Sequence, residues 1–161
     1  MKTFFLFLSL LGFIACSKTK SDDCPQTVYS YDYKTNANVD TIRSSANWLS
    51  VTETNGDSLL FRYTMNYIAC PAIEDAGVTE TLFFAVDPGV NSFIYSMANF
   101  QKAMVYFRRS CFCVQRGGFV VPQSGTITGT RLNAKSWKIY FDIMISNDDR
   151  VQHSAVFTVK P

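Results

Sequence analysis

The chain has a single histidine, His153, and none of the short motifs that mark common catalytic or nucleotide-binding sites. It contains no Gly-x-Ser-x-Gly turn and no glycine-rich phosphate loop. It also lacks the Asp-x-Asp-x-Asp-Gly spacing of a calcium loop, and one histidine leaves few ligands for zinc. The sequence therefore predicts no metal, no cofactor and no catalytic residue, and a hydrolase is the least supported function.

Repeats, low-complexity tracts and a second domain boundary are absent too. Apolar residues make up 47% and aromatic residues 15% of the chain, which argues against disorder. The 15 basic residues nearly balance the 13 acidic ones, and we expect no nucleic-acid partner. One domain over residues 25–161 is the simplest interpretation.

Residues 1–15 have the pattern of a secretory signal. Lys2 precedes an apolar run that is too short to span a bilayer as a helix. The run ends in Gly12-Phe13-Ile14-Ala15-Cys16, which resembles the lipobox of bacterial lipoproteins. The resemblance implies that Cys16 is acylated and becomes the first residue of a membrane-anchored protein, with residues 16–24 forming the lipidated cysteine and a polar tether. An ordinary cleaved signal is the alternative.

The lipobox also implies a place in the cell envelope, most simply the outer membrane of a Gram-negative bacterium. The chain has five cysteines, and lipidation of Cys16 leaves an even number to pair in that oxidising compartment. Cys111 and Cys113 are two residues apart, so a bond between them would need a bent strand. The two other connectivities both join this pair to Cys24 and Cys70. A Cys-x-Cys metal site or redox pair is the alternative.

Period-two alternation of apolar residues predicts strands along most of the chain. It is clearest in Leu59 to Ala69 and in Trp137 to Ile145. Asn55-Gly56 and Asp87-Pro88-Gly89 predict turns. About eight to ten strands in one domain predict an antiparallel β-sandwich, with a lipocalin-like closed barrel as the alternative.

Two stretches are less regular. Asn36-Ala37-Asn38 is expected to end the first strand. Lys102 to Val114 reads as a core strand that ends at Cys111-Phe112-Cys113, although a short helix around residues 97–103 is an alternative.

Basic residues dominate the stretch from Pro88 to Phe141, which contains no acid. A surface for an anionic ligand is one interpretation, and neutralisation by acidic neighbouring strands is the other. The residues of this possible surface are Arg108, Arg109, Arg116, Arg131, Lys135 and Lys138.

Arg108 and Arg109 are adjacent in a predicted strand, so their side chains must point to opposite faces of the sheet. The inward arginine needs a carboxylate partner from elsewhere in the chain, for which Glu74, Glu80 and Asp142 are candidates. The other arginine is expected to be free for an anionic ligand.

Four aromatic residues could form a contact surface or could cover the second face of the sheet: Tyr29, Tyr31, Tyr33 and Trp48. Taken together, the sequence predicts a non-catalytic, lipid-anchored envelope domain that binds a partner protein or a glycan. A lipocalin-like carrier of a small apolar ligand is the alternative, although the Gly-x-Trp start of lipocalins is missing.

Overall fold

The computed structural model describes residues 26–68, 77–111 and 117–160. Most of these residues lie in strands, and α1 (Met97–Phe100) is the one helix among them. The strands are β1 (Gln26–Arg43), β2 (Leu49–Asn55), β3 (Ser58–Ile68), β4 (Val78–Val86), β5 (Ser92–Ser96), β6 (Tyr106–Cys111), β7 (Ser124–Asn133), β8 (Ser136–Ser146) and β9 (Asp149–Val159).

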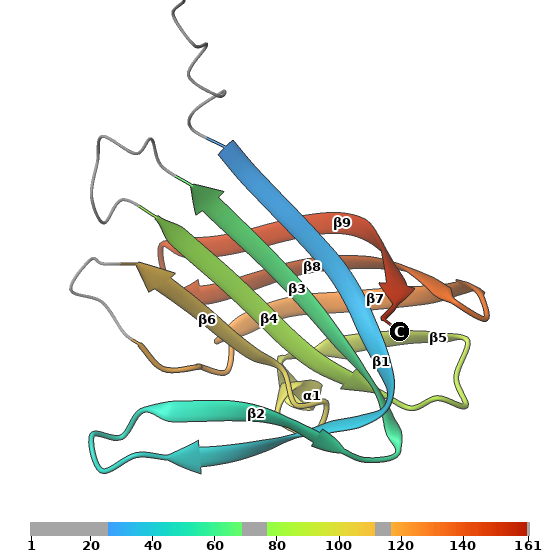
Figure 1. Cartoon of the computed structure of the whole chain (residues 1–161), viewed down its shortest axis with the longest axis horizontal. Coiled ribbons are helices and arrows are strands. Elements are labelled where there is room, and N and C mark those ends of the chain that lie inside the picture. Colours follow the sequence, from blue (N-terminus) through green and yellow to red (C-terminus); the bar gives the residue numbers. More distant parts are fainter. Residues whose placement is uncertain (1–25, 69–76, 112–116, 161) are drawn as a thin grey trace, which may run out of the picture.

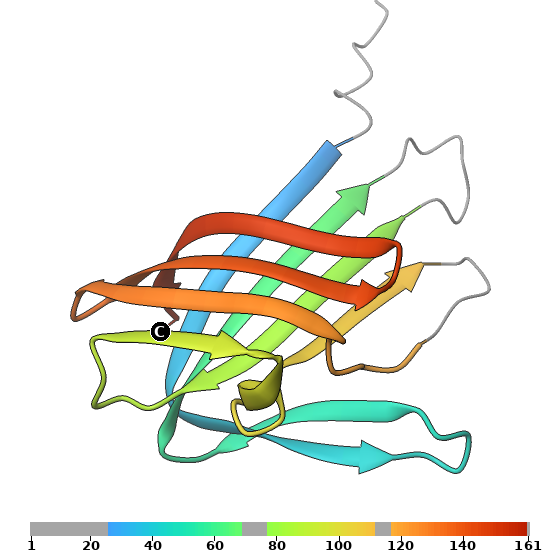
Figure 2. The ribbon, with the colours of Figure 1, turned by 180° about the vertical axis from the view of Figure 1, so that it is seen from behind.

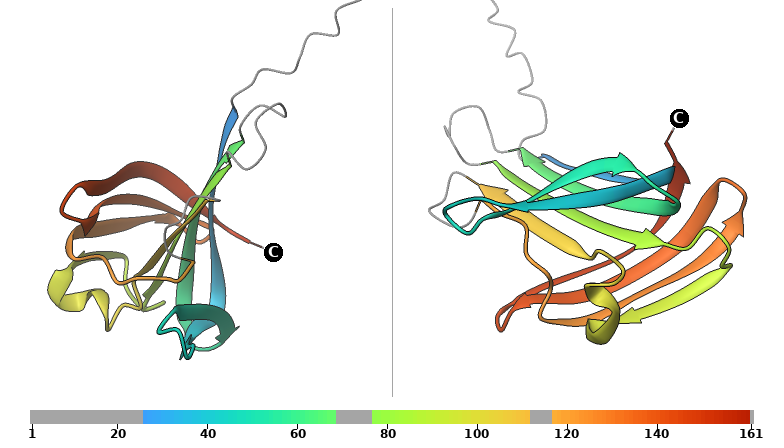
Figure 3. Two further views of the ribbon diagram at one scale, coloured as in Figure 1. Left: turned by 90° about the vertical axis from the view of Figure 1, so that its left-hand side faces the viewer. Right: turned by 90° about the horizontal axis from the view of Figure 1, so that it is seen from below.

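The strands form one sheet in the order β5-β7-β8-β9-β1-β3-β4-β6, and β2 pairs with β1. This sheet folds into two layers that diverge from the junction of β9 and β1 (Figure 3). We call β1, β3, β4 and β6 the first layer, and β5, β7, β8 and β9 the second layer. The β1–β9 junction is short and parallel, with Asp32 opposite Thr158 and Tyr33 opposite Val159.

The predicted β-sandwich is therefore confirmed, with one correction: the sheet is mixed rather than purely antiparallel. The alternative of a closed barrel is wrong, because the end strands β5 and β6 belong to different layers and do not pair with each other in the described chain. Figure 2 shows β5 at the rim of the second layer, beyond β7.

The main core fills the space between the layers. The alternation predicted for β8 is confirmed, since Trp137, Ile139, Phe141 and Ile143 are fully buried. Aromatic rings from the first layer meet them: Phe61 packs edge-on against Trp137 with ring centroids 5.7 Å apart, and it stacks on Phe84 of its own layer at 5.0 Å. The interior is thus packed with side chains.

A second, smaller core lies on the outer face of the first layer. It forms because β1 does not end at Asn36, as expected, but bends there. Asn36 has a φ of 54°, and the pairing register with β3 shifts between Lys34 and Ala37. This bulge redirects the strand into a hairpin with β2, seen at the bottom of Figure 1. Its members are Ala37, Val39, Leu49, Leu60, Phe83 and Phe119.

The predicted strand from Lys102 to Val114 is wrong in its first part, and the helical alternative is closer. The chain forms α1, then a turn in which Met104 has a φ of 52°, and enters β6 only at Tyr106. The turn is favoured because it buries Phe100 and Ala103 in the main core. The end of the predicted strand, residues 112–114, lies outside the described residues.

Candidate functional site

Arg109 is the arginine that points inward, between the two layers. The sequence predicts that such an inward arginine pairs with a carboxylate. Its Nε lies 2.8 Å from Oε1 of Glu80, the residue opposite it on β4. Its Nη1 lies 2.6 Å from Oδ2 of Asp149 at the start of β9. Burial lowers the pKa of Arg109, but the hydrogen bonds to Asp149 and Glu80 outweigh burial and leave the pKa raised. The prediction that one arginine pairs with a distant acid is confirmed.

Tyr63 extends this pairing toward the core. Its hydroxyl lies 3.1 Å from Oε2 of Glu80 and 3.1 Å from Nε2 of His153, and Nδ1 of His153 lies 3.5 Å from the hydroxyl of Tyr31. The chemistry assigns the protons: Tyr63 donates to the carboxylate, so the Nε2–H of His153 donates to the Tyr63 oxygen. Burial lowers the pKa of His153, against the opposing charge of Glu80, and the ring is neutral at pH 7.

We call these residues the interlayer network: Tyr31, Tyr63, Glu80, Arg109, Asp149 and His153. Burial, followed by the charge of Glu80, raises the pKa of Tyr63 far above its ordinary value. Glu80 as a whole residue is 6% exposed, and its carboxylate accepts hydrogen bonds from both Arg109 and Tyr63. These polar groups form hydrogen bonds with one another, and the bonds connect strands of the two layers.

Arg108 lies on the other side of β6, on the outer face of the first layer. Its guanidinium carbon is 4.8 Å from the ring centroid of Phe119. No carboxylate in the described part of the chain pairs with it. The other arginine of this face, Arg62, is paired instead with Asp32 and Glu53, at 3.1 and 3.2 Å.

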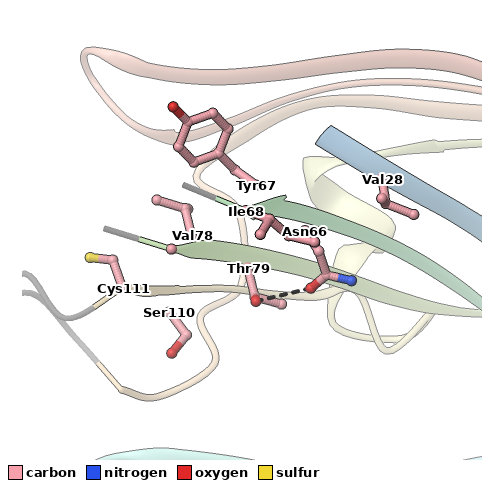
Figure 4. Close-up of a pocket in the computed structure, with 9 residues that line it drawn as sticks. Val28, Asn66, Tyr67, Ile68, Val78, Thr79, Ser110 and Cys111 are labelled. Atoms are coloured by element: carbon pink, nitrogen blue, oxygen red, sulfur yellow. Dashed lines mark hydrogen bonds between the residues drawn. The ribbon is translucent and has the colours of Figure 1, made fainter. Parts of the chain in front are cut away.

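Two hollows open on this outer face. One, of about 390 Å³, lies between β2 and the layer and is lined in part by Thr64, Thr81 and Arg108. The other, of about 540 Å³, is shown in Figure 4. Its floor includes Asn66, Thr79 and Ser110, which point to one side of the layer in Figure 4, while Tyr67, Val78 and Cys111 point to the other.

Strand register explains why these polar residues gather. Thr64, Thr81 and Arg108 lie opposite one another on β3, β4 and β6, and so do Asn66, Thr79 and Ser110 two residues away. Residues two apart on a strand share a face, so the six side chains form two adjacent rows. We call Thr64, Asn66, Thr79, Thr81, Arg108 and Ser110 the polar grid.

The other basic residues of the predicted surface do not join Arg108. Arg109 is turned inward, and Arg116 lies outside the described residues. Arg131 is held over the ring of Trp137 at 5.0 Å and donates to the carbonyl oxygen of Pro88. Lys135 and Lys138 lie at the β7–β8 turn and on β8, in the second layer.

The four predicted contact aromatics are also separated. Tyr29, Tyr31 and Tyr33 point inward from β1, and their exposure falls from 45% at Tyr29 to 2% at Tyr33. Burial, followed by the charge of Tyr29, raises the pKa of Tyr31. Trp48 is 56% exposed and precedes β2, away from the three tyrosines.

Cys111 is the one predicted disulfide residue that the structure describes, and it is not a free thiol. Cys24, Cys70 and Cys113 lie outside the described residues, as does the lipidation site Cys16. The connectivity therefore stays a prediction.

Sequence reasoning identified His153 only as the single histidine and did not foresee its contact with Tyr63 or the role of Asp149. One signal was available, since Glu80 lies in a strand whose second half, Leu82 to Val86, is entirely apolar, and a buried carboxylate needs partners. Within the described residues, no group of three or more His, Cys, Asp or Glu side chains is placed to hold a metal ion. No helix there is long and apolar enough to cross a membrane.

Comparisons with known proteins find no matching family model, no matching curated protein and no matching solved structure.

Proposed function

We propose that this chain is a non-catalytic binding domain of the bacterial cell envelope, anchored by lipid at Cys16, and that it binds through the outer face of the first layer. The observation that carries the proposal is the pair of hollows on that face, whose floor presents the polar grid. Hollows of this size suit small ligands or parts of larger ones.

The lipid anchor is supported by the lipobox resemblance and by the polar residues between Cys16 and the start of β1 at Gln26. An outer-membrane location follows from the same resemblance. A Cys16→Ser variant should move the full chain from the membrane fraction to the soluble fraction without changing its thermal unfolding. Unchanged membrane fractionation of this variant would rule out the anchor.

Binding is favoured over catalysis by the state of the ionisable groups. His153, the single histidine, is neutral and enclosed by Tyr31 and Tyr63. Glu80 and Arg109 neutralise each other. A hydrolytic site would need a nucleophile or an activated water next to such groups. In the described chain, the hydrogen bonds of His153, Glu80 and Arg109 go to other members of the interlayer network instead.

Binding on the outside is also favoured over a carrier function. A carrier of an apolar ligand needs an interior cavity, whereas the space between the layers holds interlocked rings such as Phe61, Phe84 and Trp137. The hollows described above lie on the outer face.

The proposal is tested with two matched substitutions in full-length protein purified in detergent. Ser110→Trp fills part of the outer face of the first layer, and Ser154→Trp adds the same ring at an exposed serine of the second layer. The immobilised variants are exposed separately to polysaccharide and protein fractions of bacterial envelopes. Retention should be lost with Ser110→Trp and kept with Ser154→Trp. Equal retention by both variants would contradict a binding surface on the first layer.

A further inference from the structure

The polar grid has hydrogen-bonding capacity that the protein does not use. Thr79 donates to Oδ1 of Asn66 at 3.0 Å, which leaves the amide NH₂ of Asn66 available. The hydroxyls of Thr64 and Ser110, which are partly or fully exposed, make no side-chain hydrogen bond within the described part of the chain, whereas Thr81 is buried at 7% exposure. Each hydroxyl can donate one hydrogen bond and accept others, which is the pattern that sugar hydroxyls need.

Arg108 gives the grid its single charge. It is partly buried, and Phe119 supports its guanidinium from one side. The nearby carboxylate of Glu53 is already paired with Arg62 and Lys34. Arg108 therefore stays without a carboxylate partner among the described residues, and its planar guanidinium matches a carboxylate or sulfate in a two-pronged geometry.

The size and border of the grid also fit a saccharide. Three strands about 4.8 Å apart, with two rows of residues roughly 7 Å apart, leave room for a short oligosaccharide. Val28 and Ile68, which line the hollow of Figure 4, are 44% and 51% exposed. They offer apolar surface to the C–H faces of sugar rings.

From these features we infer that the polar grid binds an acidic oligosaccharide, with a carboxylate or sulfate of the ligand on Arg108 and its hydroxyls on Thr64, Asn66 and Ser110. This inference rests on the proposed function and names the ligand class of its binding surface. A peptide partner is the competing occupant, but five of the six grid side chains are uncharged hydroxyls or an amide, which favours a polyhydroxylated ligand.

The test uses full-length protein in detergent and an array of uronic, sialic and sulfated oligosaccharides, each beside a neutral analogue such as its methyl ester or desulfated form. At least one acidic saccharide should bind, and its neutral analogue should bind about tenfold more weakly or worse. Arg108→Gln should reproduce that loss. Arg150→Gln, which removes an exposed arginine from the second layer, should bind as the unchanged protein does.

Thermal unfolding of Arg108→Gln checks whether the variant is folded. Equal binding of acidic and neutral saccharides, equal binding by the two variants, or binding of no saccharide at all would overturn the inference. If envelope retention still depends on Ser110 in such a case, the ligand class alone is wrong. If retention is unaffected by Ser110→Trp, the proposed function fails as well.

Discussion

Arg108 and Arg109 are neighbours in β6, yet they lie in opposite environments. Arg109 enters the space between the layers and meets two carboxylates, Glu80 and Asp149. Arg108 faces outward and lies over Phe119 without a carboxylate in the described chain. The alternation of a strand forces this separation. One arginine therefore joins the two layers of the sandwich, while the other keeps its charge on the outer face, where we propose that it meets a ligand.

The strongest way to break the comparison is to reverse each charge. Arg109→Glu would put a third carboxylate beside Glu80 and Asp149. We expect a loss of about 3 kcal/mol in the free energy of unfolding. This is near the low end of the cost of breaking a buried ion pair, because the Arg109 side chain is partly exposed. Arg108→Glu should cost less than about 1 kcal/mol. Urea unfolding of both variants measures the difference, and two equally harmless reversals would contradict the assignment of faces.

Removing the acid instead of the base gives a second contrast of smaller size. Glu80→Gln keeps the shape of the side chain but weakens the bonds to Arg109 and Tyr63, and should cost about 2 kcal/mol. Glu53→Gln on the outer face should cost less than about 1 kcal/mol, because its partners Arg62 and Lys34 are partly exposed. The same urea midpoints decide the outcome. An equal cost at both positions would show that the interlayer network adds no special stability.

The two faces should also differ in their response to acid. The pKa of His153 is lowered by burial below its ordinary value of 6.5, so the unfolded chain binds the proton more tightly than the folded one. Stability should therefore fall as the pH drops below 6.5, and His153→Gln should flatten that slope. Thermal unfolding between about pH 5 and 8 tests this, while binding through Arg108 should hardly change over the same range. An unchanged slope in His153→Gln would place the acid sensitivity elsewhere.

Much of this contrast could be predicted from the sequence because it depends on local alternation. The opposite directions of Arg108 and Arg109 follow from adjacency alone, and the buried faces of β3 and β8 follow from their period-two pattern. Glu80 was a candidate partner because the stretch around the arginines contains no acid. These features need no knowledge of which strands lie side by side.

The rest depends on pairing between distant strands, which alternation does not encode. The polar grid exists only because β3, β4 and β6 bring Thr64, Thr81 and Arg108 into one row. The role of Asp149 depends on the second layer folding over the first. The predictions from local sequence were wrong in two places. Asn36 bends β1 where the end of the strand was expected, and the turn at Met104 delays the start of β6.

The smallest expected effect separates the charge of Arg108 from its shape. Arg108→Lys keeps the positive charge, but an ammonium cannot form the planar two-pronged contact or lie on Phe119 in the same way. Stability should stay within about 0.5 kcal/mol of the unchanged protein. Binding of an acidic saccharide should weaken, but by less than in Arg108→Gln. A titration of the three proteins with one acidic saccharide at constant salt measures the order. If Arg108→Lys binds as tightly as the unchanged protein, Arg108 acts as a simple point charge. If it binds as weakly as Arg108→Gln, the geometry of the guanidinium carries the recognition.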